Sequence, residues 1–218
     1  HRDLHSFPTR RSSDLDFGTA PIGDFFCHNF DPALWALELR EPLTIEAHAV
    51  GGVDPHIAPP GGLYTYRFGA RGKMPPVKFT WYEGGLIPAR PEGLEPDDRL
   101  GAGGNGILFV GDKGLLTCAG WGGRPTLLPG SRNDAYERPP QTLPRSKGHH
   151  RDWLDACKGG PPASANFDYA AVLTEIGLLG LVALRVGKKM FWDAQAAQAT
   201  NAPEADRFLH GTYRPGWR

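Results

Sequence analysis

"GLYTYRFGA" (residues 62–70) alternates aromatic side chains with threonine and arginine, the pattern of a β-strand that buries one face. Residues 43–50 alternate in the same way, and "VKFTWYEGG" (77–85) predicts a third strand that ends at two glycines. Residues 106–120 hold two short apolar runs around Gly-Asp-Lys-Gly, which is typical of a β-hairpin. The middle of the chain is therefore predicted to be mainly antiparallel strand.

The C-terminal part of the chain changes from strand to helix patterns. Residues 166–189 are apolar on most faces, which predicts a long and largely buried helix. "MFWD" (190–193) predicts a final strand, and residues 121–147, broken by five prolines, predict a loop. Shorter helices are predicted at 23–39, 149–160 and 202–210.

The order of these elements favours an α+β fold, a mainly antiparallel open sheet with helices packed on one face, because strands come first and helices later. In the first predicted helix, apolar residues recur at 26, 30, 34 and 37, close to helical spacing. Pro32 falls inside this helix and is expected to kink or divide it.

Charge and hydropathy exclude several classes of partner. The 218 residues include 24 basic and 24 acidic side chains, so the net charge of zero gives no electrostatic drive toward nucleic acid. The longest apolar run, at 176–184, has about half the length of a membrane span and predicts a buried helix, so no membrane partner is expected. The three cysteines lie far apart, which favours three buried thiols and indicates no metal site.

The first fifteen residues, "HRDLHSFPTRRSSDL", differ from the rest of the chain. They lack the continuous apolar core of a secretory signal, and two aspartates argue against a transit peptide. In one reading frame all fifteen residues resemble the translation of an adapter oligonucleotide used in short-read sequencing. We therefore interpret residues 1–15 as an artefactual, disordered segment, and we expect the native sequence to begin near Asp16, inside a longer gene.

Asp24 and His28 are the first candidate functional pair. Their spacing of four places both side chains on one face of a helix, a turn apart. A carboxylate beside an imidazole can orient the ring and raise its pKa, which suits a general base near neutral pH. The alternatives are an N-cap or a surface pair. The surrounding phenylalanines suggest an apolar setting, in which a histidine needs a partner.

The stretch "DFGTAPIGDFFCHNFDPALWAL" (16–37) resembles the helix that opens the C-terminal domain of the Gfo/Idh/MocA oxidoreductases. That helix has a Gly-Asp-x-x-x-His-x-x-Asp pattern, which Gly23, Asp24, His28 and Asp31 match. Further segments are similar to the bacterial branch of the family: "MPPVKFTWYEGG", "GNGILFVGDKG", "ACKGG", "NFDYAAVLTE", "ALRVGKKMFWD" and "TNAPEADRFLHGTYRPGW". The resemblance therefore runs from Asp16 to the C-terminus.

The resemblance implies a two-domain enzyme of which residues 16–218 are the C-terminal substrate and oligomerisation domain. The N-terminal Rossmann domain, which would bind NAD or NADP, and the family's catalytic lysine would then lie upstream and be absent here. The implied reaction oxidises a sugar or polyol hydroxyl. His28 would accept the hydroxyl proton, and Asp24 would bind the substrate or hold the imidazole. The glycine-rich stretch at 101–114 runs into a strand and not into a helix, so it predicts a loop and a hairpin turn, and the cofactor-binding residues stay unassigned.

Three further residues are weaker candidates for substrate contact. Trp81 and Tyr82 are able to stack on a sugar ring, although aromatic strand residues more often belong to the core. His149 comes just before a predicted helix, where a cap or an exposed position is the alternative. The resemblance also implies a homo-oligomer formed through the face of the sheet.

Other functions stay open at this point. Some members of the family use tightly bound NAD to cleave glycosides, and a non-enzymatic interaction domain built on the sheet is a different class. A metal hydrolase that uses Asp24, His28 and His149 is poorly supported, because no ligand set with the usual spacing is present. The compartment, cytoplasmic or exported to the periplasm, is not determined by these residues.

Overall fold

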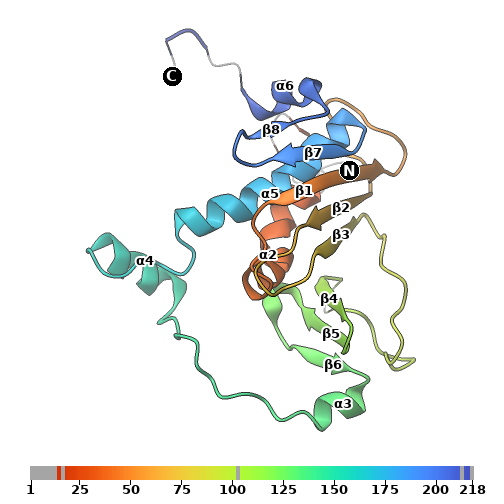
Figure 1. The fold of residues 1–218 in the computed structure, drawn as a ribbon, viewed down its shortest axis with the longest axis vertical. Coiled ribbons are helices and arrows are strands. Elements are labelled where there is room, and N and C mark those ends of the chain that lie inside the picture. The colour runs from red at the N-terminus through yellow and green to blue at the C-terminus, as the bar shows by residue number, and fades with distance from the viewer. Residues whose placement is uncertain (1–13, 16–17, 102–103, 212–213, 217–218) are drawn as a thin grey trace, which may run out of the picture. The chain divides into compact units, whose positions relative to one another are not determined.

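The computed structural model describes residues 14–15, 18–101, 104–211 and 214–216 (Figure 1). Backbone contacts divide the chain into two compact units, each with an antiparallel sheet of its own. The α+β class with antiparallel strands is therefore confirmed, but the strands form two sheets where the sequence predicted one. Unit 1 comprises His1–Ala89 and Thr174–Arg218, and unit 2 comprises Arg90–Leu173.

The sheet of unit 1 has five strands in the order β3-β2-β1-β7-β8. All four strands predicted for this part of the chain are confirmed. In the register of the sheet, Tyr66 of the second strand lies opposite Ile45 on one side and Phe79 on the other. The strands are β1 (Pro42–Ala49), β2 (Gly62–Phe68), β3 (Val77–Glu83), β7 (Met190–Asp193) and β8 (Gln198–Ala199).

The two faces of this sheet differ because successive side chains of a strand point to opposite sides. Tyr64, Tyr66 and Phe68 of β2 point to one face and are at most 2% exposed. Thr65 and Arg67 point to the other face, where Thr65 is half-buried and Arg67 is exposed. The alternation in the sequence thus specifies a covered face and an open face.

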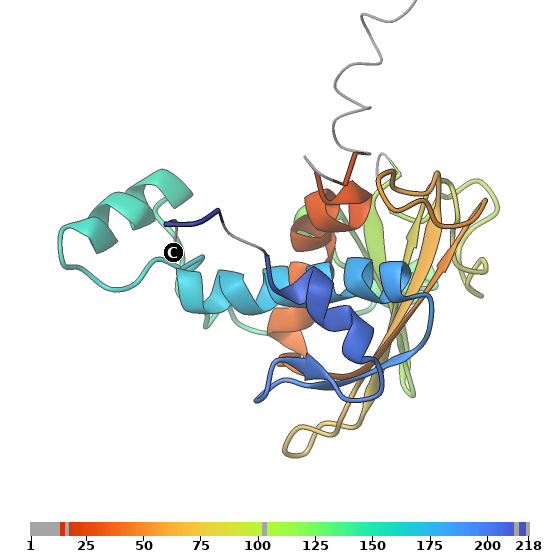
Figure 2. The same ribbon diagram turned by 90° about the horizontal axis from the view of Figure 1, so that it is seen from above.

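Helices of unit 1 lie on the covered face (Figure 2). The ring of Phe26 packs 6.0 Å from that of Tyr66 and 5.5 Å from that of Trp81, measured between ring centroids. Phe30, one turn later, packs 4.5 Å from Phe79. This aromatic layer forms the core between helix and sheet. The helices are α2 (Ala20–Ala36), the part of α5 (Phe167–Val186) that follows Leu173, and α6 (Asp206–Leu209).

Helix α2 continues through Pro32, so the expected division of this helix is wrong. Proline lacks the N–H that a helix interior uses, and this loss costs about 3 kcal/mol. Phe26 and Phe30, just before the proline, are at most 2% exposed, and Ala33, just after it, is 3% exposed. Burial of the same helix face on both sides of Pro32 offsets the loss.

Helix α5 confirms the predicted long apolar helix. Its length and composition alone would allow it to cross a membrane, and 44% of that stretch is buried within the protein. A side chain at Gly177 would lie 3.0 Å from the ring of Phe26, and one at Gly180 would lie 2.7 Å from Ile22. The two glycines therefore let α5 pack closely against α2, as in the core helix of a globular protein.

Unit 2 contains a three-stranded sheet in the order β4-β5-β6. The predicted hairpin is confirmed as β4 (Gly106–Gly111) and β5 (Gly114–Ala119), joined at Asp112 and Lys113. The predicted helix at 149–160 is confirmed as α4 (His149–Cys157). The remaining short elements of this unit are the 3-10 turn η1 (Gly120–Gly122), β6 (Thr126–Leu128) and α3 (Gly130–Asp134).

The prediction of an uninterrupted loop over residues 121–147 is therefore partly wrong. The strand β6 occupies three residues between Pro125 and Pro129 and pairs with β5 alone. Proline is tolerated beside an edge strand, because the N–H that it lacks faces away from a partner. The helix predicted at 202–210 is confirmed in two parts, the 3-10 turn η2 (Pro203–Ala205) and α6.

Residues 1–15, interpreted from the sequence as artefactual, lie outside the described residues except for the last two, where the N–H of Leu15 donates to the carbonyl of His56 at 2.7 Å. The expectation of three buried thiols is wrong, because Cys118 is buried but Cys27 and Cys157 are exposed. Neighbouring residues of a helix point to different faces, so Cys27 lies off the side of α2 on which Phe26 meets the sheet, and it is exposed.

Candidate functional site

The side of helix α2 that faces away from the sheet carries Asp24 and His28. Both side chains are exposed, and the helical spacing of four residues places them a turn apart. The ring of Phe25, also exposed, meets the imidazole of His28 edge-on at 6.1 Å. The pair predicted from sequence therefore lies together on an accessible surface.

The setting of His28 differs from the expected one. The sequence suggested an apolar environment, but Phe26 and Phe30 point into the core while His28 points outward. A helix separates neighbouring residues onto different faces, so apolar neighbours in the sequence need not be neighbours in space. The accessibility of His28 suits a residue that meets a ligand or a second domain.

Acidic side chains set the electrostatics of this surface. Although Cys27 is exposed as a residue, partial burial of its thiol raises the pKa, and the negative charges of Asp24 and Asp31 raise it further. Two carboxylates thus act on the thiol that lies between them in the sequence.

Gly23, which begins the sequence pattern, has a steric role. A side chain at this position would overlap the side chain of Thr19 one turn earlier. Glycine therefore allows the chain that enters α2 to lie against the first turn of the helix.

Trp81 and Tyr82, both proposed to contact substrate, lie on opposite faces of the sheet. Trp81 is 8% exposed, and its indole N–H donates to Oε2 of Glu83 at 2.9 Å. Tyr82 is half-buried on the open face, opposite Leu63 of β2. The structure therefore does not bring these two rings together, and it places Trp81 in the aromatic core.

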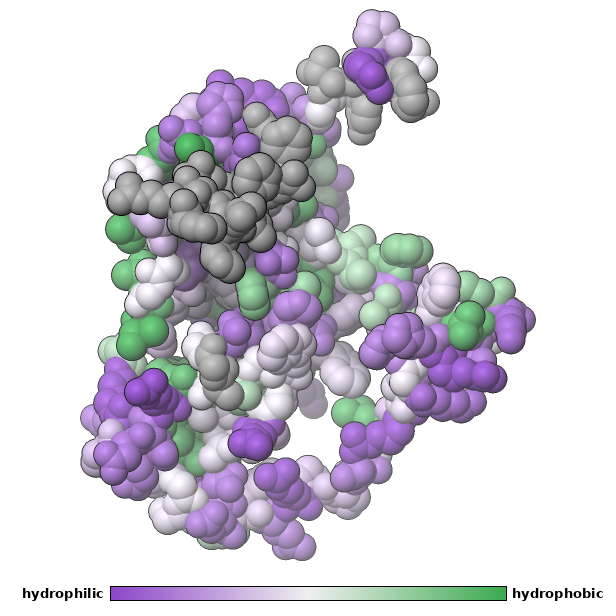
Figure 3. Space-filling model, turned by 180° about the vertical axis from the view of Figure 1, so that it is seen from behind, coloured by the Kyte–Doolittle hydropathy of each residue, from purple (hydrophilic) through white to green (hydrophobic). Residues whose placement is uncertain are grey.

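His149 belongs to unit 2, where it is the first residue of α4. Its side chain is exposed, and its ring lies 4.3 Å from that of His150. Hydrophobic side chains are also exposed on α4 and at the start of α5 (Figure 3), where Leu154 and Phe167 are 42% and 92% exposed. Unit 2 therefore exposes both His149 and apolar side chains.

Glu83 is a residue of this region that the sequence reasoning missed. It is 6% exposed and accepts a hydrogen bond from the hydroxyl of Tyr64 at 2.8 Å in addition to the one from Trp81. The sequence did contain a signal for it. Phe79, Trp81 and Glu83 occupy alternate positions of β3, so their side chains must point to the same face of the sheet. A charged residue at a strand position whose side chain points into the core marks a buried polar site.

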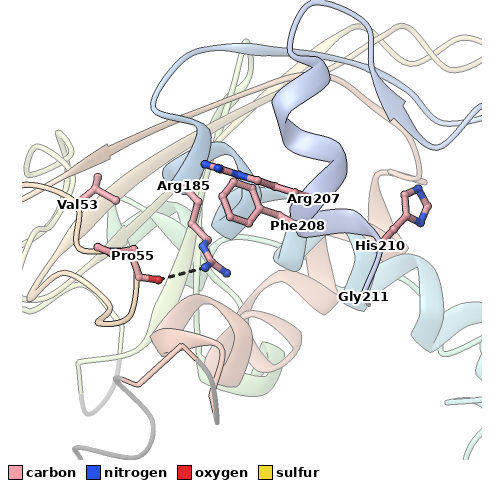
Figure 4. A pocket seen from close by; sticks show the side chains of 7 residues that line it. All are labelled: Val53, Pro55, Arg185, Arg207, Phe208, His210 and Gly211. Atoms are coloured by element: carbon pink, nitrogen blue, oxygen red, sulfur yellow. Dashed lines mark hydrogen bonds between the residues drawn. The ribbon is translucent and has the colours of Figure 1, made fainter. Parts of the chain in front are cut away.

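A cavity of about 650 Å³ lies elsewhere in unit 1, between the loop at 53–55 and the C-terminal helix α6 (Figure 4). Two guanidinium groups approach the ring of Phe208, Arg185 at 4.3 Å and Arg207 at 4.5 Å from its centroid. Arg185 also donates to the carbonyl of Pro55 at 3.1 Å. These contacts join the end of α5, the loop and α6, and they leave the cavity with a cationic lining.

In the part of the chain that the structure describes, no three histidine, cysteine or acidic side chains gather as metal ligands would. Gly101 and Gly104 precede the strand β4, whereas a phosphate-binding loop of a dinucleotide fold precedes a helix.

No protein-family model matches the chain, and no curated protein matches it.

Proposed function

We propose that residues 16–218 form the substrate domain of an NAD(P)-dependent oxidoreductase of the Gfo/Idh/MocA type, which acts on a sugar or polyol hydroxyl. The observation that carries this proposal is the position of Asp24 and His28, which lie a turn apart on the exposed side of a helix whose other side is fixed to the sheet. The sequence resemblance supplies the reaction, and cofactor binding is assigned to a Rossmann domain upstream of Asp16.

The side chains of α2 have defined roles in this proposal. The imidazole of His28 accepts the proton of the substrate hydroxyl while the carbon that bears this hydroxyl is oxidised to a carbonyl. The carboxylate of Asp24 accepts a hydrogen bond from a substrate hydroxyl or from the imidazole, which orients the group that reacts. The bound NAD(P) supplies the hydride acceptor.

The decisive experiment begins with the gene. The coding sequence upstream of Asp16 is read from genomic DNA, the complete protein is expressed, and reduction of NAD and NADP is measured with a panel of sugars and polyols. The proposal expects a dinucleotide-binding domain upstream and turnover by the complete protein, with none by the 218-residue chain. A complete gene without such a domain, or turnover by the 218-residue chain alone, would contradict it.

Substitution of the proposed base tests its role in the complete protein. His28→Ala is expected to lower kcat about 100-fold or more, as for loss of a general base, with little change in the affinity for the cofactor. Phe25→Ala removes the neighbouring ring without removing a proton acceptor, so it serves as the matched control. Equal turnover of wild type and His28→Ala would remove this residue from the mechanism.

The products separate the dehydrogenase from the NAD-dependent glycosidase. A dehydrogenase releases a carbonyl product with one reduced cofactor for each turnover, whereas a glycosidase with bound NAD releases an alcohol and a free sugar without net reduction. Incubation of the complete protein with aryl glycosides distinguishes them. Release of the aryl alcohol without accumulation of NADH would replace the dehydrogenase by the glycosidase.

We also propose that the open face of the five-stranded sheet pairs in a homo-oligomer. This face carries Leu63, Tyr82 and the 47% exposed Phe191 among polar side chains. Tyrosine and phenylalanine are enriched at interfaces between subunits. Sedimentation of the 218-residue chain and of Leu63→Lys tests this assignment, because a charge at the interface is expected to dissociate the oligomer.

A further inference from the structure

The buried carboxylate of Glu83 receives hydrogen bonds from three directions. The hydroxyl of Tyr64 donates to Oε1 at 2.8 Å, and the indole of Trp81 donates to Oε2 at 2.9 Å. The backbone N–H of Ile22, in the first turn of α2, is the third donor. Three converging donors match an ionised carboxylate, which only accepts hydrogen bonds.

The start of α2 needs such an acceptor. The first N–H groups of a helix have no partner within it, and a side chain at the N-cap often accepts from one of them. Thr19 occupies the N-cap of α2 but makes no capping hydrogen bond with its side chain. Glu83 takes over this function from the neighbouring strand, and its negative charge also suits the positive end of the helix dipole.

We propose that Glu83 is a positioning residue that fixes the start of α2 to β3 and thereby sets the positions of Asp24 and His28. Ile22 lies two residues before Asp24, so the anchored turn is the one that carries this carboxylate. His28 follows one turn later on the same face. The consequence for catalysis rests on the proposed function, whereas the anchoring of the helix does not.

Glu83 stabilises the start of this helix although its burial is unfavourable. Burial raises the pKa of Glu83 against the opposing effect of its three hydrogen-bond donors. The titratable groups that face it from β2 are the hydroxyls of Tyr64 and Tyr66, and burial raises the pKa of both. A residue kept mainly for stability would be better replaced by an apolar one, so this position suits a residue kept for geometry.

Amide hydrogen exchange on the 218-residue chain tests the anchor directly. Glu83→Gln keeps the size of the side chain but removes its charge, and we expect exchange of the Ile22 amide to become faster by about tenfold or more. Tyr64→Phe is the matched control, because it removes one donor and leaves the carboxylate in place for Ile22. Unchanged exchange at Ile22 in Glu83→Gln, or an equal increase in Tyr64→Phe, would overturn the proposal.

A titration of the wild-type chain keeps the proposal testable if Glu83→Gln does not fold. The NMR shifts of the Glu83 side-chain carboxyl and of the Ile22 amide are followed across acidic pH. Both are expected to change with the same midpoint, because protonation weakens the acceptor for the amide. An Ile22 amide that does not follow the carboxyl would refute the anchor.

In the complete protein, Glu83→Gln is expected to lower kcat with little change in the KM for NAD(P), and Tyr64→Phe is expected to lower it less. Normal kcat in Glu83→Gln with faster exchange at Ile22 would refute the effect on the catalytic pair. If the wild-type complete protein shows no oxidoreductase activity, the proposed function fails while the exchange results still decide the anchor.

Discussion

The two sheets of this chain differ in how much they bury. In unit 1, Tyr64, Tyr66 and Phe68 of one strand are at most 2% exposed beneath a layer of helices. In unit 2, the strand residues Cys118 and Leu128 are buried, and the other described strand side chains of that unit are half-buried or exposed. Because burial of apolar surface is the main stabilising contribution, the same substitution is expected to cost more in unit 1.

The largest expected effect comes from a matched pair of phenylalanines. Phe26→Ala removes a ring that is 2% exposed and touches four other aromatic rings, so it should lower the free energy of unfolding by about 3–5 kcal/mol. Phe109→Ala in β4 removes a half-buried ring and should cost about half as much. Urea unfolding measures both. Equal losses would show that the two sheets are stabilised alike.

A pair of glycines gives the next largest effect. Gly180→Ala places a methyl group 2.7 Å from Ile22 and closer still to the hydroxyl of Tyr66, so it should destabilise unit 1 by about 1–3 kcal/mol. Gly130→Ala in unit 2 adds the same methyl group with no atom within 4 Å, and little change is expected. Thermal unfolding compares the variants. A neutral Gly180→Ala would show that α5 and the sheet can move apart without loss.

The pH dependence of stability should also trace to unit 1. The pKa of Glu83 is raised in the folded state, so the folded chain binds this proton more tightly than the unfolded chain. The stabilisation of the folded state that comes from binding this proton is fully present below the pKa that Glu83 has in the unfolded chain. It is lost as the pH rises through the pKa that Glu83 has in the folded chain. Urea unfolding as a function of pH should show this decrease in wild type, and Glu83→Gln should lack it. An identical decrease in both proteins would assign it to other groups.

The smallest expected effect compares two thiols. The pKa of Cys27 in unit 1 is raised by burial and by nearby carboxylates, whereas that of Cys118 in unit 2 is raised by burial alone. Asp24→Asn should therefore increase the rate of alkylation of Cys27 by iodoacetamide, by less than about threefold, and leave Cys118 unchanged. Peptide mass mapping follows each thiol separately. An equal change at both cysteines would indicate general loosening and not a local charge effect.

The sequence predicted the longer elements of unit 1 well, because each has a strong local period, whereas the two-residue strand β8 was not predicted. The alternation in 62–70 and the apolar helix at 166–189 are repeated over enough residues to exclude other structures. The three residues of β6 form a strand only because β5 is beside them, so the loop predicted there was partly wrong. The division into two sheets depends on which strands pair, and strand pairing is a long-range property.

The candidate site shows the same limit. The spacing of Asp24 and His28 predicted a shared helix face, and they do share one. The apolar residues near His28 in the sequence suggested an apolar setting, but the helix places Phe26 on its buried side and His28 on its exposed side. No sequence motif predicted the hydrogen bonds of Glu83, because its partners Tyr64 and Ile22 are distant from it in the sequence.

The sequence by itself determined the local periods, the α+β class and the face on which each strand or helix side chain lies, because these follow from backbone geometry that repeats every two or 3.6 residues. The tertiary structure alone decided which residues meet across elements: the aromatic layer around Phe26, the close packing at Gly180, and the three donors on Glu83. Contacts of that kind depend on packing between distant segments, and no local pattern encodes them.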